Sequence, residues 1–227
     1  MDLTAKADAD CVRQFLVFVQ DPLFPCLGAK AALSRQSLEI MLARDIQSGW
    51  NDLEIHARLV EFVADYRKDL RPFRSFAVLF QHPSELTEPE FEQALWDRIQ
   101  SFADKDEWKG LMPDPQVSDN PVDPHFSLSI GGEGFFVVGL HPLASRPARR
   151  FVRPAMVFNL HHQFETLRSD GRYEKLRERI LARDVALAGS ENPMLQAFGE
   201  GSEARQYSGR AVGPDWTCPY QGRRRSP

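Results

Sequence analysis

The chain has 227 residues, of which 42% are hydrophobic and 26% are charged, and its formal net charge is −4. This composition is typical of a globular protein, and a chain of this length can bury one substantial core, so we expect a single domain over residues 1–227. The slight acidity argues against a general affinity for nucleic acid or for an anionic membrane surface. No apolar run approaches the roughly 20 residues that span a bilayer, so no membrane partner is expected.

The N-terminal residues and the cysteines bear on the compartment. The first ten residues are acidic and lack the basic-then-apolar order of a secretory signal. Cys11, Cys26 and Cys218 form no CxxC pair, which argues against a structural zinc site and a disulfide framework. Cys26 is expected to act as a small buried hydrophobic residue. These features favour a cytoplasmic protein.

The N-terminal half is expected to form helices around one strand. We expect a helix over residues 10–19, a loop over residues 24–28, a helix over residues 51–68 and a strand over residues 75–80. The helix at 51–68 places apolar residues at helical spacing, whereas the segment at 75–80 is a short apolar run of the kind found in strands.

Thr87 and Glu90 have the spacing of a capping box, and Pro89 is tolerated in a first turn, so the clearest helix of the chain begins here. Its apolar face predicts packing on a core. We expect residues 104–124 to form a long loop around a short helix near Trp108.

The central part of the chain predicts a sheet. Segments 126–130 and 135–140 flank a glycine-rich turn and indicate a β-hairpin, and residues 155–160 predict a further strand. A helix is expected over residues 172–187. This order of elements favours an α+β fold in which several helices pack on a small, mainly antiparallel sheet.

Two histidines directly follow apolar strand segments. His141 comes after residues 135–140 and His161 after residues 155–160, and a basic cluster lies between them. Imidazole nitrogens bind iron or transfer protons, and guanidinium groups bind carboxylates or phosphates. The pattern is therefore consistent with a metal-centred anionic cofactor, but equally with polar strand ends beside solvated arginines. The cluster consists of Arg146, Arg149, Arg150 and Arg153.

Other histidines and motifs carry less information. His56 and His125 are expected at the surface, in a helix and in a loop. The glycine-rich turn lies between two strands, without the strand-to-helix context of a nucleotide site, and neither a GxxxxGK[ST] nor a GxSxG motif is present. The polar tail beyond Gly189 contains Trp216, which favours docking onto the body of the protein.

Taken together, these segments resemble the YqcI/YcgG family over nearly the whole chain. The resemblance rests on motifs spread from the first loop to the tail. They are Phe24-Pro25-Cys26, Gly131-Gly132, Gly139-Leu140-His141-Pro142, Arg149-Arg150-Phe151, Val157-Phe158-Asn159-Leu160-His161, Gln163-Phe164-Glu165, Arg183-Asp184, Asn192-Pro193-Met194-Leu195, Phe198-Gly199, Ser202-Glu203-Ala204-Arg205-Gln206-Tyr207-Ser208-Gly209-Arg210 and Trp216-Thr217-Cys218-Pro219.

The resemblance implies a haem-dependent oxygenase that N-hydroxylates arginine or a related guanidine compound, as members from the guanitoxin and D-cycloserine pathways do. It implies haem b, a guanidine substrate, and an electron donor or peroxide as a further partner, and it leaves the oligomeric state open. The alternatives are a non-catalytic haem carrier or sensor and a cofactor-free interaction protein.

The implied site residues combine the family motifs with the histidine–arginine pattern. His141 is expected to bind the iron, with His161 as the alternative ligand or as an acid–base residue. Arg146, Arg149 and Arg150 are expected to pair with the haem propionates. Glu165 and Glu203 are the expected partners of the guanidinium group. Arg205, Tyr207 and Arg210 are expected to bind the rest of the substrate.

Overall fold

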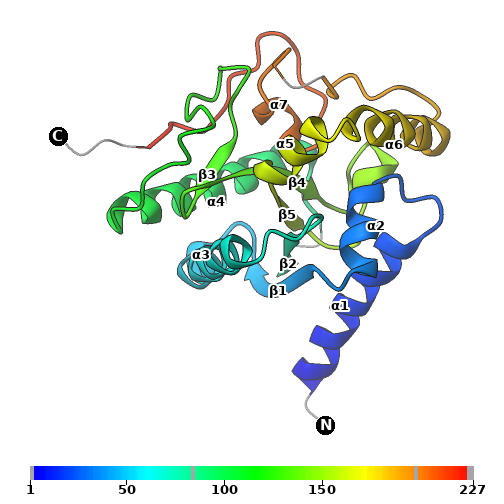
Figure 1. Ribbon diagram of the computed structural model, residues 1–227. Coiled ribbons are helices and arrows are strands. Elements are labelled where there is room, and N and C mark those ends of the chain that lie inside the picture. Colours follow the sequence, from blue (N-terminus) through cyan, green and yellow to red (C-terminus); the bar gives the residue numbers. More distant parts are fainter. Residues whose placement is uncertain (1–2, 83–84, 197–198, 224–227) are drawn as a thin grey trace.

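The protein is built on one five-stranded sheet with strand order β1-β2-β5-β4-β3 (Figure 1). Only β1 and β2 pair in parallel; the other neighbouring strands are antiparallel. This topology confirms the expected α+β fold. The structure is a computed structural model that describes residues 3–82, 85–196 and 199–223. Its elements are α1 (Leu3–Gln20), α2 (Leu27–Ser34), β1 (Leu38–Asp45), η1 (Gly49–Asn51), α3 (Asp52–Lys68), β2 (Ser75–His82), α4 (Glu88–Trp108), β3 (Leu128–Ile130), β4 (Glu133–Leu140), η2 (Pro147–Arg149), β5 (Ala155–Leu160), α5 (His161–Ser169), α6 (Tyr173–Ala188) and α7 (Ala204–Tyr207).

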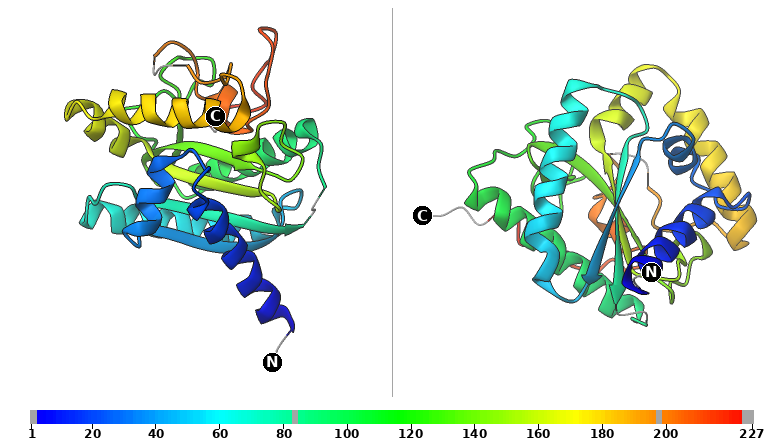
Figure 2. Two further views of the ribbon diagram at one scale, coloured as in Figure 1. Left: turned by 90° about the vertical axis from the view of Figure 1, so that its right-hand side faces the viewer. Right: turned by 90° about the horizontal axis from the view of Figure 1, so that it is seen from below.

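The two faces of the sheet are covered differently. Successive side chains of a strand point to opposite faces, so Phe135 and Val137 join one core while Val138 and Leu140 join another. Helices α3 and α4 cover the first face, and α1, α2 and α6 lie on the second (Figure 2). The sheet is therefore the middle layer of the molecule.

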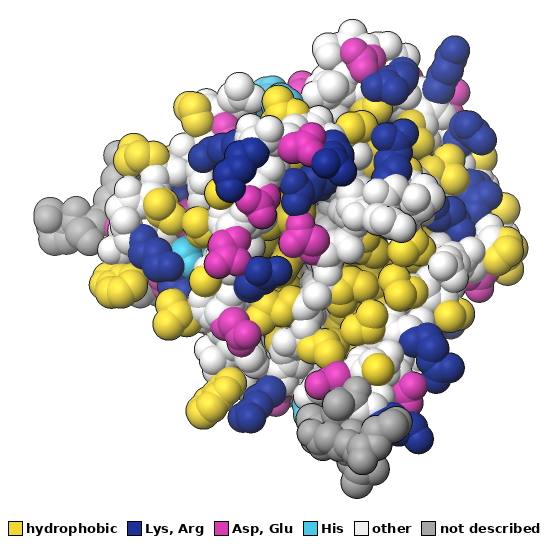
Figure 3. Space-filling view, turned by 60° about the horizontal axis from the view of Figure 1, so that its bottom comes forward, with side chains coloured by type: hydrophobic (Ala, Val, Ile, Leu, Met, Phe, Trp, Pro, Cys, Tyr) yellow, Lys and Arg dark blue, Asp and Glu magenta, His cyan; other side chains and the backbone are white. Residues whose placement is uncertain are grey.

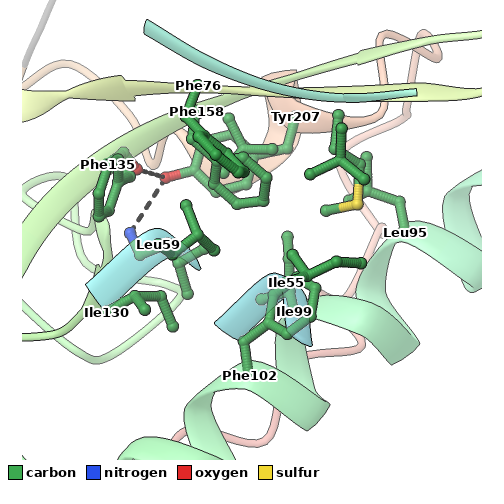
Figure 4. Close-up of a cluster of buried hydrophobic side chains, with 14 of the residues drawn as sticks. Ile55, Leu59, Phe76, Leu95, Ile99, Phe102, Ile130, Phe135, Phe158 and Tyr207 are labelled. Atoms are coloured by element: carbon green, nitrogen blue, oxygen red, sulfur yellow. Dashed lines mark hydrogen bonds between the residues drawn. The ribbon is translucent and has the colours of Figure 1, made fainter. Parts of the chain in front are cut away.

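The core on the first face holds the larger cluster and includes part of the C-terminal tail. Tyr207, from α7, is fully buried among side chains of α3, α4 and the strands (Figure 4). Its hydroxyl donates to the carbonyl of Phe135 at 2.9 Å and accepts from the amide of Leu128 at 3.2 Å. The tail is thus docked onto the body of the protein, as Trp216 suggested.

Two local signals in the sequence correspond to observed structure. Thr87 caps α4, and both halves of the capping box with Glu90 are present. Gly131 and Gly132 have φ values of 63° and 82° in the turn between β3 and β4, a conformation that glycine adopts without steric cost. The expected helix that begins near Thr87 and the expected β-hairpin are therefore confirmed, and β5 matches the strand expected at 155–160.

Other parts of the chain differ from the sequence-based expectation. Helix α4 continues to Trp108 and so includes the beginning of the expected loop. Neither α2, β1 nor α5 was anticipated, and α5 follows β5 without a loop. His56 is fully buried, not exposed, because it lies on the core face of α3, where its Nε2 contacts Asp106 at 2.7 Å.

Strand β1 is one edge of the sheet, and its apolar side chains other than Ala43 are only partly buried. Figure 3 shows hydrophobic side chains gathered on the face that comes forward from the bottom of Figure 1, bordered by charged side chains of both signs. Among the described residues, no helix combines the length and the apolar character needed to cross a bilayer.

Gly139 of β4 allows α4 and the tail to approach the sheet, and we predict that Gly139→Ala is strongly destabilising. An added Cβ would lie 2.7 Å from both Leu95 Cδ1 and Phe91 Cε1, and 2.9 Å from the backbone oxygen of Tyr207. Chemical denaturation should show a loss of about 3 kcal/mol in the free energy of unfolding. Gly213→Ala, where a Cβ meets no atom within 4 Å, is the matched control and should change stability by less than about 0.5 kcal/mol. Equal stability of the two variants would contradict this packing argument.

Candidate functional site

The second face of the sheet carries a cavity with two adjoining lobes. The lobes have volumes of about 220 Å³ and about 210 Å³, and residues from α2, the sheet and α6 line both of them. The shared lining residues include Cys26, Phe136, Asn159 and Ile180. Pockets of this mostly apolar kind, with few polar groups, are the usual sites for small ligands and cofactors.

The position of α6 creates this space. Helix α6 packs mainly against α5 and η2. The side chains of Phe136 and Val138, which point from β4 to this face, therefore form part of the floor, and Leu176 and Ile180 of α6 lie on the opposing wall. A helix held off the sheet in this way leaves apolar side chains facing each other across a gap.

Cys26 lies where the two lobes meet. It is the N-cap of α2, and its Sγ accepts a hydrogen bond from the amide of Ala29 at 3.4 Å. Burial raises the pKa of the Cys26 thiol, and this is opposed in part by the backbone amides of Ala29 and Gly28 and by the charge of Arg149. The thiol is thus the stable form of the free protein, in a site whose cationic groups would favour a thiolate.

His141 and His161 lie at opposite ends of the sheet. Strands β4 and β5 are neighbours and antiparallel, with Leu140 opposite Ala155 and Phe135 opposite Leu160. The residue after β4 and the residue after β5 therefore leave the sheet at opposite ends of this strand pair. The two imidazoles cannot act on one ligand atom.

His141 faces the helices of the first face. Its ring stacks on Phe91 with the centroids 4.4 Å apart, and it is 1% exposed. Burial lowers the pKa of His141, and its Nδ1 is buried without a hydrogen-bond partner among the described residues. His141 lines neither lobe of the cavity, so its orphaned nitrogen does not face the cavity.

His161 belongs to a hydrogen-bonded chain of four side chains, Glu203, Ser127, His161 and Glu165, which we call the polar chain. Ser127 Oγ donates to Glu203 Oε2 at 2.7 Å and lies 3.2 Å from His161 Nδ1. His161 Nε2 is 3.1 Å from Glu165 Oε1. Both ring nitrogens are thus engaged, and burial lowers the pKa of the imidazole. Neither nitrogen is free to bind a metal.

Gly134 explains how His161 fits against the sheet. A Cβ at position 134 would lie 3.1 Å from the Cβ of His161 and 3.0 Å from Val117 Cγ1. The absence of a side chain at this position in β4 lets the first turn of α5 approach the strand. Ser127, which comes just before β3, can then reach the imidazole.

The predicted propionate-binding arginines are used within the protein. Arg146 pairs with Asp184, and Arg150 donates to the carbonyls of Ala144 and Ser145. Arg149 donates to the carbonyls of Gly139, Gln206 and Tyr207, and burial lowers its pKa to about 10. Arg146 and Arg149 line the second lobe, whereas Arg150 does not.

Of the predicted substrate-binding residues, only Glu203 lines the cavity. Burial raises its pKa to about 7, from an ordinary value of 4.5. Tyr207 is a core residue, Arg205 donates to the carbonyls of Val212 and Gly213, and Arg210 pairs with Glu92 on α4. These three residues thus anchor the tail.

Sequence reasoning missed Cys26 and Ser127 as site residues. Cys26 lies within a quoted motif, but its place at the junction of two lobes depends on the packing of α6. Ser127 has no local signal at all.

In the described part of the chain, no group of three or more His, Cys, Asp or Glu side chains is placed to hold a metal ion. Haem iron needs only one or two ligands from the protein, so this finding does not bear on haem.

We predict that Glu203→Gln stabilises the protein above neutral pH. A raised folded-state pKa means that the wild-type carboxyl favours folding below its unfolded pKa of about 4.5 and that this contribution is lost as the pH rises through about 7. Unfolding free energies of the two proteins should match at pH 4 and diverge up to pH 8, with the variant more stable by as much as about 3 kcal/mol. Glu174→Gln, on an exposed turn of α6, should show no divergence. A constant difference in unfolding free energy between the two proteins across this pH range would contradict the raised pKa of Glu203.

The comparisons with known proteins show one match. The model of the YqcI/YcgG family matches residues 15–221. Neither the curated proteins nor the solved structures contain a match to this chain. The matched residues span nearly all of the chain, including the cavity and the polar chain. The protein is therefore a member of the YqcI/YcgG family.

Proposed function

We propose that this chain is a haem b-dependent oxygenase that N-hydroxylates a guanidine-containing substrate, such as arginine or a derivative. The observation that carries the proposal is the apolar two-lobed cavity with Cys26 at the junction of its lobes and carboxylates on its walls. The family resemblance supplies the class of reaction, and the cavity supplies a place for it.

The lining residues fit a haem group better than the predicted histidines do. Iron in haem proteins is bound by His, Cys, Met or Tyr. Among the described residues that line the cavity, Cys26 and Tyr173 are of this kind, and only Cys26 lines both lobes. Cys26 would therefore hold the iron as a thiolate, and the apolar side chains of Phe136, Val138 and Ile180 would contact the macrocycle.

The charged residues at the cavity suit the other groups. Arg177, on the α6 wall of the first lobe, is the candidate partner for a propionate, because Arg146 and Arg149 already bind protein acceptors. The nearby charge of Arg149 favours the thiolate of Cys26.

Glu203 in the first lobe is the candidate partner of a guanidinium group, because a carboxylate accepts its parallel N–H donors in fork geometry. Pairing with such a cation would favour the ionised form of Glu203, against the effect of burial. When bound, haem supplies the activation of oxygen or peroxide that the reaction requires. The protein's own residues bind the substrate, orient its nitrogen and exclude water from the cavity.

The proposal places the protein in the cytoplasm. Cys11, Cys26 and Cys218 are all free thiols in the structure. Free cysteines are typical of a reducing compartment, and the thiol of Cys26 must stay reduced to bind iron. An electron donor or peroxide would be the second partner of the enzyme.

We predict that the purified protein binds haemin with a Soret band typical of thiolate ligation, and that Cys26→Ala loses this spectrum. Cys218→Ala is the matched control, because Cys218 packs against the other core and does not line the cavity. The control should keep the wild-type spectrum. Titration of haemin against each protein by absorption spectroscopy gives both the affinity and the ligand type. An unchanged spectrum in Cys26→Ala with a loss in His141→Ala would overturn the Cys26 assignment.

The alternative function is a non-catalytic haem carrier or sensor. The two are separated by incubating the haem-loaded protein with arginine analogues and either peroxide or oxygen with a reductant. An oxygenase should yield a product heavier by one oxygen atom, detected by mass spectrometry, and Glu203→Gln should raise KM because the carboxylate binds substrate. Haem binding with no such product for any guanidine compound would support the carrier.

A further inference from the structure

The polar chain joins two different environments. At one end, Glu203 is 8% exposed and lines the first lobe of the cavity. At the other end, the side chain of Glu165 is 40% exposed. Ser127 and His161 lie between them and are 0% and 3% exposed. The two middle members therefore form a buried link between a surface carboxylate and a cavity carboxylate.

The chemistry of each member suits the passage of a proton. A serine hydroxyl donates one hydrogen bond while accepting others, and it can rotate to reverse its direction. Imidazole takes a proton at one ring nitrogen and releases another from the opposite nitrogen. In the structure the Ser127 hydroxyl donates to Glu203, so its oxygen is placed to accept from His161 Nδ1.

We infer that the polar chain is a proton conduit between solvent and the first lobe of the cavity. The conduit is a property of the chain itself, and its use in catalysis rests on the proposed function, since an oxygenase consumes protons in a site from which water is excluded. Glu203 is its inner terminus and Glu165 its outer terminus. Ser127 and His161 are positioning and relay residues that need not touch the substrate.

One inward transfer balances without a redox change. Glu203 releases its carboxyl proton into the cavity and becomes a carboxylate. The Ser127 hydroxyl passes its proton to Glu203 and takes the Nδ1 proton of His161. The Glu165 carboxylate, which also pairs with Arg168, takes a proton from solvent and passes it to Nε2 of His161. Rotation of the Ser127 hydroxyl and exchange of the imidazole protons restore the starting arrangement.

The groups that face Glu203 are consistent with this role. Ser127 and Tyr207 contact its carboxyl, Arg168 is the nearby cation, and Glu165 is the nearby anion. Burial is the largest influence and brings the pKa of Glu203 to about 7, so the carboxyl both holds and releases a proton near neutral pH.

Infrared spectroscopy of the protein without haem tests the inference directly. The carbonyl stretch of the protonated Glu203 carboxyl is identified by its loss in Glu203→Gln, and its shift on transfer to deuterated water reports proton exchange. We expect rapid exchange in the wild-type protein below pH 7 and slowing by about tenfold or more in Ser127→Ala. Ser129→Ala is the matched control, because Ser129 is a nearby buried serine that bonds the amide of Asp114 and lies outside the polar chain. Its exchange should match the wild type.

A second variant and two contrary outcomes complete the test of the proton conduit. His161→Gln breaks the conduit at a second point and should slow exchange as Ser127→Ala does, which covers the case in which one variant fails to fold. Exchange as fast as wild type in a folded Ser127→Ala or His161→Gln variant would show that protons reach Glu203 through the cavity mouth, and would overturn the inference. Absence of a protonated Glu203 band in the wild type below pH 7 would overturn it as well. Because no haem is present, these results stand apart from the test of haem binding.

Discussion

The antiparallel pairing of β4 with β5 determines the place of every candidate group in this protein. Both strands are buried on two faces, so a one-residue slip in the pairing would move the side chains that belong to one core to the other core. The register that avoids this places Phe135 opposite Leu160 and Leu140 opposite Ala155. As a consequence, His141 emerges beside α4, and His161 emerges beside the hairpin of β3 and β4.

The C-terminal tail depends on the same pair of strands. Tyr207 bonds the carbonyl of Phe135 on β4, and Arg149 ties the end of β4 to the carbonyls of Gln206 and Tyr207. Burial lowers the pKa of Arg149 to about 10, which still leaves it charged at neutral pH, and its carbonyl contacts compensate the desolvation of the guanidinium. These contacts bring Glu203, four residues before Tyr207, to the cavity wall.

The site separates apolar binding from proton chemistry. The floor of the cavity offers apolar surface around Cys26, and charged groups line both lobes, with Glu203 in the first and Arg149 and Asp184 in the second. A buried carboxylate next to a hydroxyl and an imidazole is costly unless each group is hydrogen-bonded, and in the polar chain each group is. The cavity thus offers apolar contact at its floor and a hydrogen-bonded carboxyl at the wall of its first lobe.

By itself, the sequence determined the local elements and the family. The capping box at Thr87, the glycine turn at Gly131 and the apolar run at 155–160 each specify their structure through interactions between near neighbours, so they could be recognised without the fold. The motifs spread along the chain identified the family, because they can be recognised in the sequence without the fold. Only the tertiary structure decided which side chains share a site. Strand direction separates His141 from His161, the gap beneath α6 exposes Cys26 to the cavity, and contacts across many residues of sequence join Ser127 to His161 and Glu203. These outcomes depend on long-range packing, which cannot be predicted from the residue pattern within a single segment.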